Sequence, residues 1–396
     1  MQFLGFPRPD GSVGIRNYVA VLPGGLIATK ICQFVPGTKT ICTPNHGAGM
    51  TSRDREAVAR LLIGLGRNPN VAAVLVHNAS PGAGYPELSL ERLTREIAKS
   101  GKPVEFLDVA EDAGGGLMSI ARGVAIAREL VRQASRVRRE PFGLGQLVLG
   151  VKCGASDPTS GIAGNPAVGY LFDRVVDAGG VALFGETTEI IGAETVLARR
   201  AVDDATAGKI LAAARFVEER ALSVGEDIRT INPVPANIAA GITTLEEKSL
   251  GAIHKAGHHP IAGALAYGER PPGRGLYFVD NWMNHLSIFP GYAAAGAQLT
   301  IFQLGGGGIP QRVLLDPSPA VVAPLLWATA NPSTAERCRE GIDYYSGTVI
   351  TGDETPTEAG QRFVDLVLDI ASGTLTRGET MDYADPAEIY RLDPVF

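Results

Sequence analysis

Short apolar runs alternate with helical patterns through the first third of the chain. Residues 71–76 form an unbroken apolar run, which is typical of a strand covered on both faces. Residues 52–65 instead repeat their apolar positions at the three- and four-residue spacing of an amphipathic helix. Further strands are expected at 18–22, 38–43 and 103–109, and further helices at 88–99 and 117–134. Strands separated by helices predict βαβ units with a parallel sheet.

The alternation restarts after a charged stretch at residues 136–145, which contains Pro141 and shows no period. We therefore place a domain boundary near residue 142, with one α/β domain at 1–141 and a second at 142–396. Strands are expected at 146–151, 180–184, 260–266, 275–279, 298–302 and 325–329. Helices are expected at 166–178, 244–256 and 358–372, and residues 189–222 are expected to hold one or two long helices. Residues 225–241 read as a polar loop. The predicted fold class is α/β, with two α/β domains, mainly parallel sheets and an active-site cleft between them.

Composition and charge exclude several classes of protein. The chain has 396 residues, of which 45% are hydrophobic and 20% charged, so it can bury a large core and is not mainly disordered. Its formal net charge of -6 gives no basic surface for nucleic acid. The longest stretch free of charged residues, 281–311, contains Pro290, His285, amides and glycines. It reads as the wall of a buried site and not as a membrane span.

The cysteines and the N-terminus suggest a cytoplasmic protein. The four cysteines do not form a disulfide scaffold and lack the C-x-x-C spacing of a structural zinc site. The first eight residues have no charged segment followed by an apolar core, so they do not read as a signal peptide.

Polar groups follow most of the predicted strands. Ligands of parallel sheets bind at the carboxyl ends of strands, so these groups are the first candidates for a site. The groups are His46 in the turn 44–49, His77 to Ser80, Lys152 to Asp157, Gly185 to Glu189, and Asp280 with Asn281.

Each candidate also has a purely structural explanation. His46 lies in a glycine-rich turn, and Cys153 has the character of a small buried hydrophobe. Glu186 and Glu189 fit as carboxylates at the start of a helix, where the dipole favours them. Lys248 fits as an ordinary exposed helix lysine.

The closely spaced His254, His258 and His259 suggest a metal cluster at first sight. Gly257 and Pro260 instead indicate a helix C-terminus and turn, where cationic histidine is stabilised. The glycine run 305–308 offers backbone N–H groups to an anion but lacks the ending of a P-loop.

The joint pattern of five blocks resembles the altronate and galactarate dehydratase family over nearly the whole chain. The blocks lie at residues 5–17, 152–169, 186–194, 241–251 and 370–373. The resemblance implies a metal-dependent lyase that eliminates water from a sugar acid or a related 2,3-dihydroxy acid and yields a 2-keto acid.

The resemblance and the strand-end positions together assign site residues. The expected catalytic residues are His46, Lys248 and Glu189. The expected substrate-binding residues are Arg16, Asn17, Ser156, Asp157, Asn165, Thr243 and Thr244. The expected metal ligands are Cys153, Glu186 and Asp280, and the expected metal is Fe²⁺, with which a cysteine at the site is compatible.

The chain departs from the family pattern at four places that bear on the substrate. These are Met50, the segment 78–81, the segment 279–283 and the glycine run 305–308. Two alternatives therefore stay open. One is a sulfo-lyase acting on 3-sulfolactate, whose leaving sulfite is bound by the 305–308 amides or by Arg274. The other is a non-catalytic binding or scaffold subunit.

The resemblance also bears on partners. The small N-terminal domain that is fused to some family members has no counterpart here, which suggests a separate small partner subunit of the SAF type. We further expect a homo-oligomer that binds a small-molecule acid and neither nucleic acid nor membrane.

Overall fold

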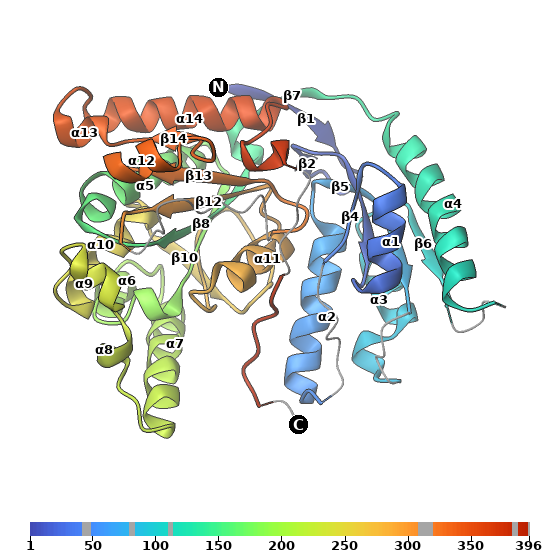
Figure 1. Cartoon of the computed structure of the whole chain (residues 1–396), viewed down its shortest axis with the longest axis horizontal. Coiled ribbons are helices and arrows are strands. Elements are labelled where there is room, and N and C mark those ends of the chain that lie inside the picture. The colour runs from blue at the N-terminus through green and yellow to red at the C-terminus, as the bar shows by residue number, and fades with distance from the viewer. Residues whose placement is uncertain (42–48, 79–83, 110–113, 308–319, 382–386, 395–396) are drawn as a thin grey trace.

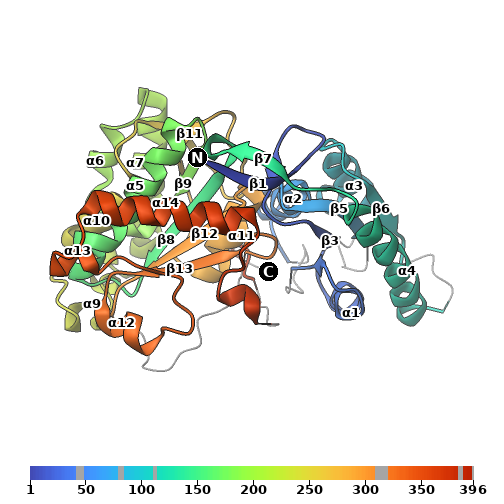
Figure 2. The same ribbon diagram turned by 90° about the horizontal axis from the view of Figure 1, so that it is seen from above.

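The computed structural model describes residues 1–41, 49–78, 84–109, 114–307, 320–381 and 387–394, which form two α/β regions lying side by side (Figures 1 and 2). The prediction of an α/β fold with mainly parallel sheets is confirmed. No helix in these described ranges is long and apolar enough to cross a lipid bilayer. The boundary at residue 142 and the cleft between two domains stay predictions.

The first region is built on a four-stranded parallel sheet with the order β4-β3-β5-β6. Its strands are β3 (Tyr18–Leu22), β4 (Thr38–Lys39), β5 (Val71–His77) and β6 (Val104–Leu107). Its helices are α1 (Leu26–Phe34), α2 (Ser52–Arg67), α3 (Leu90–Ala98) and α4 (Gly116–Ala134), with the short turn η1 (Pro86–Leu88). In β3, Val19 and Val21 pack against α1 and α4, whereas Ala20 and Leu22 pack against α2 and α3. The sheet is therefore covered on both faces, as the apolar run at 71–76 predicts.

The second region is built on a seven-stranded parallel sheet with the order β10-β11-β9-β8-β12-β13-β14. Its strands are β8 (Val148–Gly154), β9 (Val181–Phe184), β10 (Ile261–Leu265), β11 (Gly275–Val279), β12 (Leu299–Leu304), β13 (Leu325–Thr329) and β14 (Tyr344–Tyr345). Its helices are α5 (Asn165–Asp177), α6 (Glu194–Ala198), α7 (Asp204–Ser223), α8 (Ile228–Ile231), α9 (Pro235–Ala239), α10 (Leu245–Ile253), α11 (His285–Ala295), α12 (Pro332–Arg337), α13 (Thr348–Thr351) and α14 (Pro356–Ser372). Short turns are η2 (Leu144–Gln146), η3 (Ser160–Gly164), η4 (Thr187–Glu189), η5 (His254–Ala256) and η6 (Gly378–Thr380).

The two regions share one hydrophobic core. Helices α5 and α14 cover one face of the large sheet, and α14 runs along that face in Figure 2. Helix α11 covers the other face and packs directly against α2 of the first region. Apolar side chains of both sheets, of α2 and of α11 belong to the same buried cluster.

A small antiparallel sheet also connects the two ends of the predicted first domain. Strand β1 (Gln2–Pro7) pairs with β2 (Val13–Gly14) on one side and with β7 (Glu140–Gly143) on the other. Residues 140–143 show no strand pattern in the sequence, because this segment becomes a strand only through its pairing with the distant β1.

Several helices differ from the sequence-based expectation. The stretch 189–222 is interrupted where Gly192 takes a φ of 90° and where Asp203 caps α7 through Thr206 N–H. The expected polar loop 225–241 contains the short helices α8 and α9. Helix α11 lies in the uncharged stretch 281–311 and shows no amphipathic period, because it is buried almost all round.

The turn 68–70, between α2 and β5, fastens the first region to the second. The Asn68 amide donates hydrogen bonds to the carbonyls of Ala293 and Ala297, at 2.7 and 2.8 Å, and so caps the end of α11. The fully buried Asn70 side chain makes four further bonds. Its partners are the carbonyls of Gln298 and Val322 and the N–H groups of Ile15 and Arg16.

We predict that Asn70→Ala lowers the free energy of unfolding by at least about 3 kcal/mol, because it leaves four buried backbone groups without their partner. Urea unfolding followed by tryptophan fluorescence measures the change. Gln33→Ala, which removes an exposed amide on α1, is the matched control and should unfold like the unaltered protein. An Asn70→Ala midpoint equal to that of the control contradicts the prediction.

Candidate functional site

Strand β8 lies at a topological switch point of the large sheet. The chain passes from β8 to β9 on one side and later returns to β12 on the other side. Ligands of open α/β sheets bind in the crevice outside the carboxyl ends of the strands at such a point. Cys153 and Gln303 are paired in register at this end of β8 and β12.

At this end of the sheet the buried carboxylate of Glu186 contacts several polar groups. Glu186 follows β9, is fully buried and has a left-handed backbone with a φ of 67°. Its Oε2 lies 2.6 Å from Lys255 Nζ and accepts the Cys153 N–H at 2.8 Å, and its Oε1 lies 3.1 Å from Lys152 Nζ. Lys255 Nζ also lies 3.3 Å from Cys153 Sγ. The cluster of Lys152, Cys153, Glu186 and Lys255 therefore holds two ammonium groups against one carboxylate.

Electrostatics fix the protonation states in this cluster. Burial by itself would raise the pKa of Glu186, but the charges of Lys152 and Lys255 lower it below its ordinary value. Burial likewise opposes the charge on Lys255, yet Cys153 and Glu186 together raise its pKa. Burial, reinforced by Glu186, raises the pKa of the Cys153 thiol to about 11. At neutral pH Glu186 is therefore a carboxylate, Lys255 an ammonium group and Cys153 a neutral thiol.

The three expected metal ligands do not fit a divalent cation in this arrangement. Both oxygens of Glu186 face lysine ammonium groups, and the Cys153 sulfur lies 3.3 Å from Lys255 Nζ. Asp280 Oδ1 instead accepts a hydrogen bond from Thr187 Oγ1 at 2.7 Å. Across the described ranges, His, Cys, Asp and Glu side chains form no group of three or more that could hold a metal ion. The Fe²⁺ requirement stays a prediction.

A second buried pair, Lys248 with Glu189, lies next to this cluster. The Glu189 N–H donates to the Glu186 carbonyl at 2.7 Å, so the turn η4 joins the two groups. Glu189 Oε1 lies 3.0 Å from Lys248 Nζ, which also donates to Asn232 and Asn237 at 2.6 and 3.1 Å. Lys248 is 8% exposed, so the alternative of an ordinary exposed helix lysine is wrong. The second oxygen of Glu189 is buried and has no hydrogen-bond partner among the described residues.

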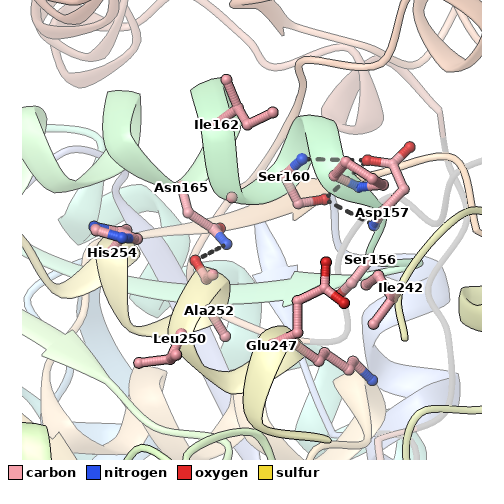
Figure 3. Close-up of a pocket in the computed structure, with 14 residues that line it drawn as sticks. Ser156, Asp157, Ser160, Ile162, Asn165, Ile242, Glu247, Leu250, Ala252 and His254 are labelled. Atoms are coloured by element: carbon pink, nitrogen blue, oxygen red, sulfur yellow. Dashed lines mark hydrogen bonds between the residues drawn. The ribbon is translucent and has the colours of Figure 1, made fainter. Parts of the chain in front are cut away.

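Lys248 lines a cavity of about 260 Å³ between the π-helical turn η3 and α10 (Figure 3). A Cβ on Gly161 of η3 would lie 3.2 Å from Gly251 Cα of α10, so these two glycines allow the close approach of the two elements. Asn165 donates to the Gly251 carbonyl at 2.9 Å, and its Oδ1 is buried without a partner among the described residues. The expected site residues that line this cavity are Ser156, Asp157, Asn165 and Lys248.

The carboxylate of Asp157 is already engaged within the protein. Its Oδ2 accepts the Gly306 N–H at 2.8 Å and Asn331 Nδ2 at 2.6 Å. Its Oδ1 accepts Thr159 Oγ1 at 2.6 Å and the Ser160 N–H at 3.2 Å. Asp157 thereby ties the glycine run to the start of η3.

The glycine run does not form the expected anion cradle within its described part. The N–H groups of Gly305 and Gly307 donate to the carbonyls of Gly154 and Ala155, and that of Gly306 donates to Asp157. All three donors are used inside the protein. Gly308 lies outside the described residues.

The remaining expected site residues lie away from the cavity. Arg16 forms a buried ion pair with Glu379 at 2.7 Å, and Asn17 bonds to Arg8 and to the Ala134 carbonyl. Thr244 caps α10 by accepting the Glu247 N–H, and Thr243 contacts the Glu247 carboxylate. Arg274 bonds to the carbonyls of Gly145 and Gly179, which precede β8 and β9 at the opposite end of the sheet. His46 lies outside the described residues.

Sequence reasoning missed the residues that complete the two buried groups. They are Lys255, Asn232 and Asn237. Lys152 and Asn281 are among the strand-end groups that the sequence indicated, and Asn281 Oδ1 accepts the Glu186 N–H at 2.9 Å. The apolar neighbours Ala252, Ile253 and Ala256 were the available indication in the sequence that Lys255 is buried.

We predict that Lys255→Met lowers the free energy of unfolding by about 3–5 kcal/mol, because it leaves the buried Glu186 carboxylate with only one ammonium partner. Thermal and urea unfolding measure the loss. Lys99→Met is the matched control: Lys99 pairs with Glu96 on the surface, so its melting temperature should not change. Equal stability of the two variants would show that Lys255 does not neutralise Glu186.

Two protein families match the chain, one over each of its two regions. Residues 144–392 match the family described as D-galactarate/altronate dehydratase, C-terminal. Residues 5–135 match the family described as D-galactarate dehydratase/altronate hydrolase, second domain.

Three relatives align with nearly the whole chain. The (2R)-sulfolactate sulfo-lyase subunit beta of Chromohalobacter salexigens is 33% identical over 97% of this chain and 96% of its own length. The altronate dehydratase of Bacillus subtilis is 30% identical over 97% of this chain and 77% of its own length. That of Escherichia coli is 28% identical over 96% of this chain and 76% of its own length. The chain therefore belongs to the D-galactarate/altronate dehydratase family, as the sequence blocks predict.

Proposed function

We propose that the chain is a lyase that eliminates water from a 2,3-dihydroxy acid of the sugar-acid class and yields a 2-keto acid. The observation that carries this proposal is the buried Lys248, which pairs with Glu189 and is among the residues that line the cavity. Family membership supplies the reaction class, and the cavity of about 260 Å³ is large enough for a small acid.

The elimination requires a base, an acid and a positive charge near the substrate carboxylate. Removal of the C2 proton leaves its electron pair to form the C2–C3 double bond, while the C3–O bond breaks and the oxygen leaves as water. The resulting enol then becomes the 2-keto acid. Lys248 Nζ donates to Glu189, Asn232 and Asn237, so the substrate has to replace one of these acceptors before the ammonium group can protonate the leaving oxygen or bind the carboxylate.

Two polar groups on the cavity wall support substrate orientation. Asn165 Oδ1 is an unused acceptor for a substrate hydroxyl, and Ser156 lies at the same wall. His46 stays the predicted base. Dependence on Fe²⁺ is part of the proposal, with no ligand set assigned to it.

A second candidate reaction is the release of sulfite from 3-sulfolactate. It is favoured by one observation: the sulfo-lyase beta subunit aligns over 96% of its length, whereas the two altronate dehydratases extend further. The same alignment supports a small partner subunit, since a protein named subunit beta is part of a larger assembly.

A substrate screen tests the proposed function. The purified chain is incubated anaerobically with and without Fe²⁺, and with D-altronate, D-galactarate or 3-sulfolactate. Formation of 2-keto acid from a sugar acid supports the dehydratase, and sulfite release supports the second candidate. Fe²⁺ should raise either rate. Turnover of none of the acids, also after addition of a small partner subunit, favours a non-catalytic scaffold.

We predict that Lys248→Met lowers kcat/KM at least about 100-fold, equivalent to about 2.7 kcal/mol, because it removes the charge at the cavity wall. Steady-state kinetics on the substrate found by the screen measure the loss. Lys209→Met, which changes an exposed lysine of α7, is the matched control and should keep full activity. Near-full activity of Lys248→Met would remove Lys248 from the active site.

A further inference from the structure

One histidine at the cavity has no structural partner. His254 follows the last residue of α10 and lines the same cavity as Lys248 and Asn165 (Figure 3). Among the described histidines it is the one that lines this cavity. Its ring makes no hydrogen bond or ion pair within the described part of the chain, so both ring nitrogens are available to a ligand.

The two neighbouring histidines behave differently. His258 Nδ1 lies 2.8 Å from Asp173 Oδ2, and His259 Nε2 lies 2.9 Å from Asp177 Oδ1. Both rings are therefore tied to α5, outside the cavity lining. The sequence suggests one cluster of three histidines, but the structure divides it into two that pair with carboxylates of α5 and one exposed histidine, His254, that lines the cavity.

The spacing of Lys248 and His254 suits two reacting groups. They lie six residues apart along α10 and its end, which corresponds to about 9 Å along a helix axis. Both residues are among those that line the same cavity. A β-elimination needs this arrangement, since the proton and the leaving group depart from adjacent carbons.

We propose that His254 is the base that takes the C2 proton, with Lys248 acting on the leaving group or the carboxylate. This inference rests on the proposed function and assigns to His254 the role of base, for which the sequence predicts His46. The imidazole accepts the proton, the C2–H electron pair forms the C2–C3 double bond, and the leaving group departs from C3 with the electrons of its own bond. The later release of the proton from the imidazolium to water restores the base.

The surroundings of His254 favour the neutral imidazole that a base requires. Partial burial lowers its pKa, and the charges of His258 and Arg200 add to this effect. The charged groups that line the same cavity are Asp157, Glu247 and Lys248, and Lys255 is its neighbour in the chain. Because protonation removes the base, activity should fall as the pH falls through the pKa of His254.

The decisive variant is His254→Gln, which keeps a polar side chain of similar length. It should lower kcat at least about 100-fold, with KM changed less than about threefold. It should also remove the decline of kcat/KM at low pH, which is the acid limb of the pH profile. His258→Gln is the matched control and should keep the rate and the limb. The proposal is overturned if His254→Gln leaves both kcat and the acid limb of the pH profile unchanged. It is also overturned if the acid limb disappears only in His46→Gln.

A second measurement separates failure of this inference from failure of the proposed function. Diethyl pyrocarbonate modifies neutral imidazole, and mass spectrometry of peptides gives the rate at each histidine. We expect D-altronate or 3-sulfolactate to slow modification of His254 at least about threefold and to leave His258 unchanged. If no acid turns over yet His254 is protected, the proposed reaction is wrong and the binding role of His254 stands. Equal rates at His254 with and without each acid overturn the inference even where turnover is seen.

Discussion

The buried carboxylate of Glu186 is the constraint on which the second region depends. It binds Lys152 of β8 and Lys255 of the turn after α10 at the end of β9. A carboxylate without such partners is costly to bury, so the ends of these three elements are fixed relative to each other. The left-handed backbone of Glu186 is held by the same contacts and by the side chain of Asn281.

This constraint extends to the cavity through the turn η4. Glu189 lies one turn beyond Glu186, and its carboxylate binds Lys248. Helix α10 is thus held near its start by Lys248 and just after its end by Lys255. The cavity is the space left between this fixed helix and η3, and the proposed reacting groups belong to a rigid element and not to a loop.

The first region is placed by a different kind of interaction. Asn68 and Asn70 use every hydrogen-bonding group of their side chains on backbone groups, most of them in the second region. Helix α2, which precedes them, packs on α11 in the shared core. Apolar packing brings the two regions together, and the two amides fix their register, because backbone carbonyls buried in the junction need specific donors.

The sequence by itself determined the apolar runs, hence the parallel strands, and the polar groups that end them, because periodicity and strand-end chemistry are local properties. It also determined the family, through blocks that include Lys248 and Asn165. Only the tertiary structure decided that Lys255 neutralises Glu186, that the glycine run is consumed by Asp157 and neighbouring carbonyls, and that His254 differs from its neighbours. Residue type cannot predict these outcomes, since each depends on which charges and donors the fold brings within bonding distance from distant positions, such as Asp157 and Gly306, which are 149 residues apart in the chain.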